Sequence, residues 1–248
     1  PLLPSLCHHL FVLRIVHVGI VAAPHALSVT TAFWSIRCGR VERCHVSSSI
    51  GLIQTYQDEV ESFYREYNAT LLHDLTIHEA MPGHVLQLAH AARARTPTRV
   101  RRFGFSGVFV EGWAVYAEEL LLDNGYAPKD SPQSALAIRL QQLKMQARMA
   151  INTILDIRVH SMEMSEDEAL RLMTFRGFQE EGEAIGKWRR ALLTAGQLPT
   201  YFVGYQAVRS IANDLRVVHP DWSDRQVHDL MLSHGSPAPR HLRTLIGI

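Results

Sequence analysis

Apolar side chains recur with helical spacing along most of the chain beyond residue 58. In residues 59–72 they follow the i, i+3, i+4, i+7 pattern of an amphipathic helix, at Val60, Phe63, Tyr64, Tyr67 and Leu71. Further helices are predicted at 73–94, 107–122, 134–159, 166–174, 181–194 and 201–219, with a last one ending at 234. Because strand-like alternation is nearly absent, the pattern predicts an all-α fold in one domain.

Two capping boxes mark helix starts in the C-terminal half. Ser165 with Glu168, and Ser223 with Gln226, each combine an N-cap hydroxyl with a long side chain three residues later. Such a pair satisfies two backbone N–H groups that the helix itself leaves free. The prolines at 237 and 239 are expected to break the chain, because proline interrupts a helix.

The first fifty residues differ in composition from the rest. They contain five charged residues, with no Lys and no Asp, but five of the fourteen histidines. The apolar run at 10–23 is interrupted by Arg14 and His17, is too short for a membrane span, and lacks the features of a signal peptide. We expect residues 1–55 to be a poorly ordered or non-homologous segment, such as a frame-shifted start, and residues 56–248 to form the helical domain.

Overall composition narrows the classes of partner. Apolar residues make up 47% of the chain and charged residues 20%, as in ordinary globular proteins. The formal charge of +1 gives no reason to expect nucleic acid or a membrane as a partner. The three cysteines all lie in the first 44 residues, so the fold does not depend on disulfides. The sequence predicts a cytoplasmic protein and carries no signal for its oligomeric state.

The clearest chemical motif is HEAMPGH at residues 78–84. In the common zinc motif HExxH, the two histidines share a helix face and the glutamate activates a water on the metal. Here His84 lies at i+6 from His78, about 120° away on an ideal helix. Because Pro82 opens the helical turn and Gly83 tolerates unusual backbone angles, a bend could bring both imidazoles to one metal. The alternative is two unrelated histidines beside a helix break.

A third ligand is available about one helix further along the chain. Glu111 and Glu118 are seven residues apart, so they share a helix face and lie about 10 Å apart along its axis. One could bind a metal while the other orients a ligand imidazole. Two carboxylates on a stripe with Ala114 and Val115 would be costly to bury without a cation. The alternative is a solvated acidic edge that includes Glu119.

HEAMPGHVLQ followed by VEGWAVYAEEL resembles the bacterial DUF885 family of zinc metallopeptidases. The resemblance runs from about residue 59 to the C-terminus and includes residues 154–160, 197–204 and 228–242. It implies a multi-helix, zincin-like metallopeptidase catalytic domain of the gluzincin type, in which a glutamate is the third ligand. Family members are about twice as long as this chain, so we expect a partial domain that corresponds to their C-terminal half.

The resemblance also assigns roles to the motif residues. It implies that one zinc ion per chain is held by His78, His84 and Glu111, with Glu79 as general base. Glu118 would then orient a ligand imidazole without binding the metal itself.

Two further residues match the family by position. His160 and Tyr201 fall where the family has a histidine and a tyrosine, and they are expected to donate to a tetrahedral oxyanion. Taken without the resemblance, His160 is typical of a helix end and Tyr201 of a core. Arg158 departs from the family, whose members tend to have glycine at this position.

The function expected from these residues is hydrolysis of a peptide or small amide substrate by a metal-activated water, with Glu79 as the base. One alternative keeps the metal but changes the reaction, to a lyase or to hydrolysis of a non-peptide amide. Another is a truncated, inactive helical remnant, or a chain that serves only as an interaction protein.

Overall fold

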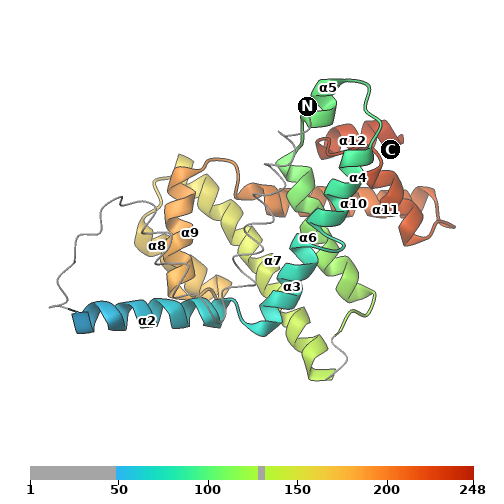
Figure 1. The fold of residues 1–248 in the computed structure, drawn as a ribbon. Coiled ribbons are helices and arrows are strands. Elements are labelled where there is room, and N and C mark those ends of the chain that lie inside the picture. Colours follow the sequence, from blue (N-terminus) through green and yellow to red (C-terminus); the bar gives the residue numbers. More distant parts are fainter. Residues whose placement is uncertain (1–48, 128–131) are drawn as a thin grey trace, which may run out of the picture. The chain divides into compact units, whose positions relative to one another are not determined.

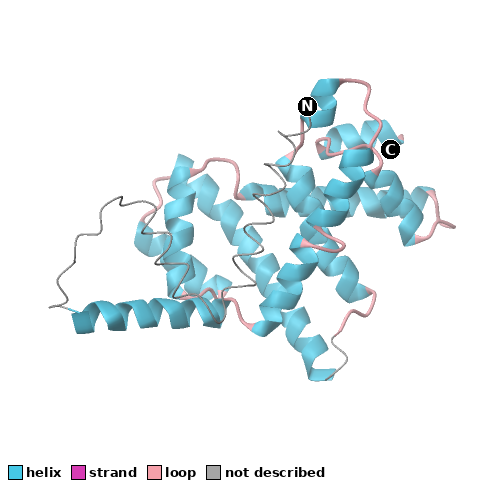
Figure 2. Cartoon of the chain, viewed as in Figure 1, coloured by secondary structure: helices cyan, strands magenta, loops and turns pink. Residues whose placement is uncertain are grey.

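A computed structural model describes residues 49–127 and 132–248, and within it Thr55–Ile248 form one compact unit. Helices and the loops between them make up this described part, in which there is no strand (Figure 2). The all-α prediction is therefore confirmed. No helix in the described ranges is long and apolar enough to cross a membrane. The expectation of a poorly ordered segment at 1–55 falls mostly on residues 1–48, outside the described ones.

The helices follow one another through short connections (Figure 1). Their bounds are α2 (Ser49–Glu66), α3 (Ala69–Glu79), α4 (His84–Arg93), α5 (Arg99–Phe103), α6 (Gly107–Asp123), α7 (Pro132–Ser161), α8 (Glu166–Arg171), the π-helical turn η1 (Leu172–Arg176), α9 (Glu181–Leu193), α10 (Pro199–Val218), α11 (Asp224–Leu232) and α12 (Pro239–Ile246). Both predicted capping boxes are present, at the starts of α8 and α11.

Two predicted helix boundaries are wrong for identifiable reasons. The helix expected at 59–72 is divided at Asn68, whose side chain accepts hydrogen bonds from the backbone N–H groups of Thr70 and Leu71, both at 3.1 Å, and so starts α3. The prolines at 237 and 239 do not end the helical part of the chain. Pro239 occupies the first turn of α12, where its missing N–H group has no partner to lose.

The packing of α6 against α10 fixes the backbone that carries Glu111. A Cβ atom on Gly112 would lie 2.3 Å from the carbonyl carbon of Gly204, so the two backbones approach more closely than any side chain would permit. Phe109 and Trp113 are almost completely buried on the same helix. These contacts hold α6 in place on both sides of Glu111.

A buried ion network joins α2, α7 and α9. Arg148 of α7 donates to Glu66 at 2.6 Å and to Glu183 at 2.8 Å. Lys144 lies 3.2 Å from the same Glu66 carboxylate, which is completely buried. Buried charges are tolerated when they are paired in this way. The network therefore fixes the three helices around one side of the cavity described below.

Candidate metal centre

The segment between the two histidines forms a complete turn rather than a kink in one helix. α3 ends at Glu79 and α4 begins at His84, so the predicted continuous helix at 73–94 is wrong. The N–H group of Gly83 donates to the carbonyl oxygen of Ile77 at 3.0 Å. The indole N–H of Trp113 donates to the carbonyl oxygen of Pro82 at 2.9 Å, which fastens the turn to α6.

Gly83 is not in the left-handed conformation, since its φ is −73°, and glycine is required there by close approach to the end of α3. A Cβ atom at this position would lie only 1.9 Å from the carbonyl oxygen of His78. The turn can therefore fold back on the end of α3 only with glycine there. This tight return is what places His84 beside His78 despite their spacing of six residues.

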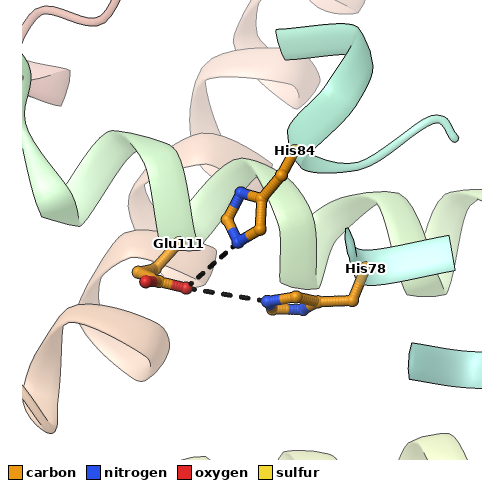
Figure 3. A group of neighbouring side chains, drawn as sticks. All are labelled: His78, His84 and Glu111. Atoms are coloured by element: carbon orange, nitrogen blue, oxygen red, sulfur yellow. Dashed lines mark ion pairs between the residues drawn. The ribbon is translucent and has the colours of Figure 1, made fainter. Parts of the chain in front are cut away.

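The three predicted ligands come together at one point (Figure 3). Nε2 of His78 lies 3.6 Å from Oε2 of Glu111, and Nε2 of His84 lies 3.5 Å from the same oxygen. One potential ligand atom from each residue lies within 4.8 Å of the other two. The two imidazole rings have centroids 4.7 Å apart and are nearly perpendicular. The residues therefore offer three converging donor atoms from α3, α4 and α6.

The distances in this group agree with the dimensions of a zinc site. With zinc–ligand bonds of about 2.0–2.2 Å in a tetrahedron, two ligand atoms lie about 3.3–3.6 Å apart. Two of the three separations, those from Glu111 to each histidine, fall at this value. Two imidazoles and one carboxylate are also the donor set of many catalytic zinc sites. The residues present thus fit a zinc ion.

The electrostatics of the group favour a cation. Burial alone would raise the pKa of Glu111, but hydrogen bonding to His78 and His84 outweighs it and lowers the pKa to about 2. Burial acts to lower the pKa of His78, yet Glu111 and Glu118 raise it well above its usual value. Both shifts show that positive charge is stabilised here.

Glu118 lies behind His78, on the side away from Glu111. Its Oε1 lies 2.6 Å from Nδ1 of His78, and its side chain is almost completely buried. Burial raises the pKa of Glu118, and the contact with His78 offsets part of that rise. The structure therefore brings Glu118 into contact with the imidazole of His78, the contact that the family resemblance implies.

A cavity of about 390 Å³ opens beside His78, the one candidate ligand that lines it, and is bordered by helices α3, α6, α7, α9 and α10. His78 and Glu79 line one part of it, and Tyr201 lines another. The hydroxyl oxygen of Tyr201 accepts hydrogen bonds from Gln197 at 3.1 Å and from Arg190 at 3.3 Å. The predicted base and one predicted oxyanion donor therefore face the same space as the first ligand.

His160 does not line this cavity, so the structure does not bring it together with the other predicted site residues. It is exposed at the end of α7, and its Nε2 contacts the carbonyl oxygens of Ala191 and Thr194 at 2.9 and 3.0 Å. The last residue of α7 that lines the cavity is Asn152, which lies about 12 Å away along the helix axis. His160 joins the ends of α7 and α9, which is a structural role.

Several polar residues of the cavity were missed by the sequence analysis, among them Asp74, Lys187 and Arg190. Asp74 is 1% exposed, and neither of its carboxylate oxygens has a partner in the described part of the chain. Burial and the nearby Glu118 raise its pKa to about 8. Lys187 and Arg190 line the cavity from α9, and burial lowers the pKa of Lys187 to about 8. The only sequence signal was the position of Asp74, one helical turn before His78.

Solved structures that resemble this fold include two bacterial proteins. One, described as "a putative lipoprotein of unknown function" from Shewanella oneidensis, is 36% identical with a TM-score of 0.67, and the match covers 76% of this chain and 33% of that one. The other, "the putative lipoprotein" from Colwellia psychrerythraea, is 21% identical with a TM-score of 0.66, covers 73% and 30%, and shows the fold alone. This chain thus spans about a third of their length. No curated protein matches it.

The residues of the candidate metal centre lie within a region that matches the model of a known protein family. The model of the family described as "Bacterial protein of unknown function (DUF885)" matches residues 46–246, most of the chain. In the sequence analysis the resemblance is expected to begin near residue 59, and the match begins thirteen residues earlier, at residue 46. It includes all three candidate ligands. The chain belongs to the DUF885 family.

Proposed function

We propose that this chain carries the active site of a zinc-dependent, gluzincin-like hydrolase that cleaves peptide or related amide bonds. One observation carries the proposal: His78, His84 and Glu111 converge within zinc-binding distance while Glu79 lines the adjacent cavity. A general base beside a two-histidine, one-glutamate set is the arrangement that hydrolytic zinc sites use. The family match gives the fold and the motif but carries no activity of its own.

The chain's own residues prepare the metal position. A zinc ion bound there would polarise the substrate carbonyl and lower the pKa of a water molecule. His78 and His84 hold the pKa of Glu111 below its usual value, which favours the ionised form that a ligand needs. Glu118 accepts a hydrogen bond from Nδ1 of His78 and so directs Nε2 toward Glu111.

Glu79 is the proposed general base. It is the last residue of α3, directly after the ligand His78, and its side chain lines the cavity. Its carboxylate pairs with no cation in the described part of the chain, so it is free to accept a proton. In the proposed reaction it takes the proton of the attacking water and then gives it to the leaving amine nitrogen.

Tyr201 is the proposed oxyanion donor. Its oxygen accepts hydrogen bonds from Gln197 and Arg190, so both polarise the hydroxyl while its own hydrogen remains available for donation. In the proposed reaction this hydrogen is donated to the oxygen of the tetrahedral intermediate. His160 has no part in the step, because it lies at the far end of α7.

The experiment is a turnover assay of the zinc-loaded chain with a mixed peptide library and a panel of non-peptide amides, with products identified by mass spectrometry. Glu79→Gln should lower kcat/KM by about 100-fold or more, and Tyr201→Phe by about 100-fold. His160→Gln is the matched control and should leave kcat/KM within about threefold, since His160 does not line the cavity. Turnover that survives Glu79→Gln would refute the mechanism.

Water labelled with ¹⁸O separates the remaining alternatives. A hydrolase incorporates the label into the carboxylate product, whereas a lyase does not. If only the non-peptide amides of the panel are cleaved, the proposed substrate class is wrong, but the assignment of the metal ligands and of Glu79 still holds. If the zinc-loaded chain cleaves nothing, the alternative of an inactive remnant or an interaction protein is favoured. The chain spans only about a third of the length of its solved relatives, which is compatible with that alternative.

The cellular location stays a prediction. The sequence favours the cytoplasm, whereas both solved relatives are described as "putative" lipoproteins. Fractionation of the native host with an antibody against this chain would decide between the cytoplasm and the cell envelope.

A further inference from the structure

Helix α7 is apolar on two faces, and only one of them is buried. Ile138, Met149 and Leu155 are at most 5% exposed on the inner face, which contacts α3, α9 and α10. A helix that packs on one side only carries polar residues on the other. α7 departs from this rule, because large apolar residues are also exposed on its outer face.

Seven apolar residues follow a strict heptad spacing along the outer face. Successive members are alternately four and three residues apart, which is the pattern of a coiled-coil seam. We call them the heptad stripe: Leu136, Leu140, Leu143, Ala147, Ala150, Ile154 and Ile157. The five large members are between 42% and 64% exposed, and the two alanines are partly exposed. The stripe is about 32 Å long, at 1.5 Å per residue.

The length and spacing of the stripe identify the kind of partner. A continuous apolar seam of this length is complementary to one long amphipathic helix packed nearly parallel or antiparallel to α7. Isolated exposed leucines are common on protein surfaces, but a row of five large aliphatic side chains in register is not.

The charges beside the stripe argue against a second copy of this chain. Arg139, Lys144 and Arg158 occupy the positions that flank the seam, and no acidic residue occupies a flanking position. Pairing two such helices would bring cations against cations. A helix with acidic residues beside its apolar seam is complementary instead, although each of the three cations already has one carboxylate partner in this chain.

We propose that the heptad stripe is the docking surface for an amphipathic helix that belongs to the additional chain of the longer family members. The solved relatives contain about two thirds of chain that has no counterpart here, which is ample for such a helix. The docking surface is separate from the cavity, whose lining from α7 comes from Met145, Arg148, Met149 and Asn152 and includes no member of the stripe.

The test applies one pair of substitutions to two intact proteins. In this chain, Leu140→Glu with Ile154→Glu replaces exposed side chains, so the melting temperature should change by less than about 2 °C and the chain should remain monomeric. In the Shewanella relative, glutamates at the two aligned positions would be buried under the docked helix and should lower the melting temperature by at least about 5 °C.

A matched control uses exposed apolar residues away from the stripe. Leu193→Glu with Val217→Glu changes two side chains that are 84% and 80% exposed, and the aligned changes should be tolerated in both proteins. If the stripe glutamates are tolerated in the relative as well, the additional chain does not cover the stripe and the proposal is wrong.

Two other results would also overturn the proposal. If this chain is dimeric and the stripe glutamates make it monomeric, a second copy covers the stripe. If the glutamates lower the melting temperature of a monomeric chain by several degrees, another part of the same chain covers it. Circular dichroism at 20 °C establishes that each variant has folded before these comparisons are made.

Discussion

Oε1 of Glu118 and Nδ1 of His78 lie 2.6 Å apart and join α6 to α3 across forty residues of sequence. In the neutral imidazole, an N–H group at Nδ1 that donates to the carboxylate leaves the lone pair on Nε2. Nε2 is the atom that faces Glu111. Glu118 therefore favours the orientation and the tautomer in which His78 would bind a metal through Nε2.

We predict that Glu118→Gln weakens zinc binding by about 10- to 100-fold, because the amide orients and polarises the imidazole less well than a carboxylate does. Competition with a fluorescent zinc chelator gives the dissociation constant. Glu119→Gln is the control: Glu119 is the neighbouring residue, but its carboxylate contacts Tyr205 and Arg209 instead. Equal affinities for wild type and Glu118→Gln would show that the contact does not support the metal site.

We predict that Gly83→Ala disrupts the turn between α3 and α4. The added Cβ atom would lie 1.9 Å from the backbone oxygen of His78, so the turn must open and His84 must move away. The free energy of unfolding should fall by about 2–4 kcal/mol, and zinc affinity should fall with it. Chemical denaturation and the chelator competition measure the two effects.

Gly186→Ala is the matched control for this substitution. Gly186 lies inside α9, and a Cβ atom there would meet nothing within 4 Å. The change should leave zinc affinity unaltered and stabilise the helix by up to about 1 kcal/mol. If both alanine variants behave alike, the close approach at Gly83 has no energetic consequence.

We predict a pH-dependent loss of stability that arises from His228. Burial lowers the pKa of this imidazole to about 4 from its usual 6.5, and its Nε2 lies 2.9 Å from the hydroxyl of Tyr116. Because the pKa is lower in the folded state, the unfolded chain gains the proton first. The stability contributed by neutral His228 is therefore complete above pH 6.5, is lost as the pH falls toward 4, and is constant below that.

The size of the loss is on the order of 3 kcal/mol, from the two pKa values. Denaturation curves at pH 7 and pH 4 measure it when wild type is compared with His228→Gln, which keeps a partner for Tyr116 but does not titrate. Wild type should lose more stability than the variant over this interval. An equal loss in both proteins would mean that His228 is not the group responsible.

The candidate ligands could be proposed from sequence, because local spacing offered two histidines and either Glu111 or Glu118, and the resemblance to DUF885 selected Glu111. His78 and His84 are six residues apart, and Glu111 stands on the next apolar helix. The nature of the turn could not be predicted, since a bend in one helix and a complete turn between two helices both satisfy the Pro-Gly pair. The carbonyl contact at Gly83, which decides between them, depends on coordinates.

The composition of the cavity could not be predicted, because its wall is built by packing. Lys187 and Arg190 reach it from α9, more than a hundred residues beyond His78 in the chain, and nothing in their own segment marks them. The position of His160 outside the cavity has the same origin. The sequence predicted the long helix at 134–159 but not which of its turns face the cavity, and His160 lies about 12 Å past the last one that does.

The fold class could be predicted from periodicity, whereas helix boundaries depended on single residues. Asn68 resembles an ordinary polar position within an amphipathic run, and only its two contacts with backbone N–H groups identify it as a cap. Pro239 stops one helix or starts another according to where the preceding residues turn, which periodicity does not specify.

The measurement that tests the account most directly is the zinc content of the purified chain after loading with zinc and desalting. Wild type and Glu79→Gln should each retain about one zinc per chain, because Glu79 is not a ligand, whereas His84→Ala should retain far less. Wild type that retains well under one zinc, or His84→Ala that retains as much as wild type, would contradict the assignment of His78, His84 and Glu111 as a metal centre.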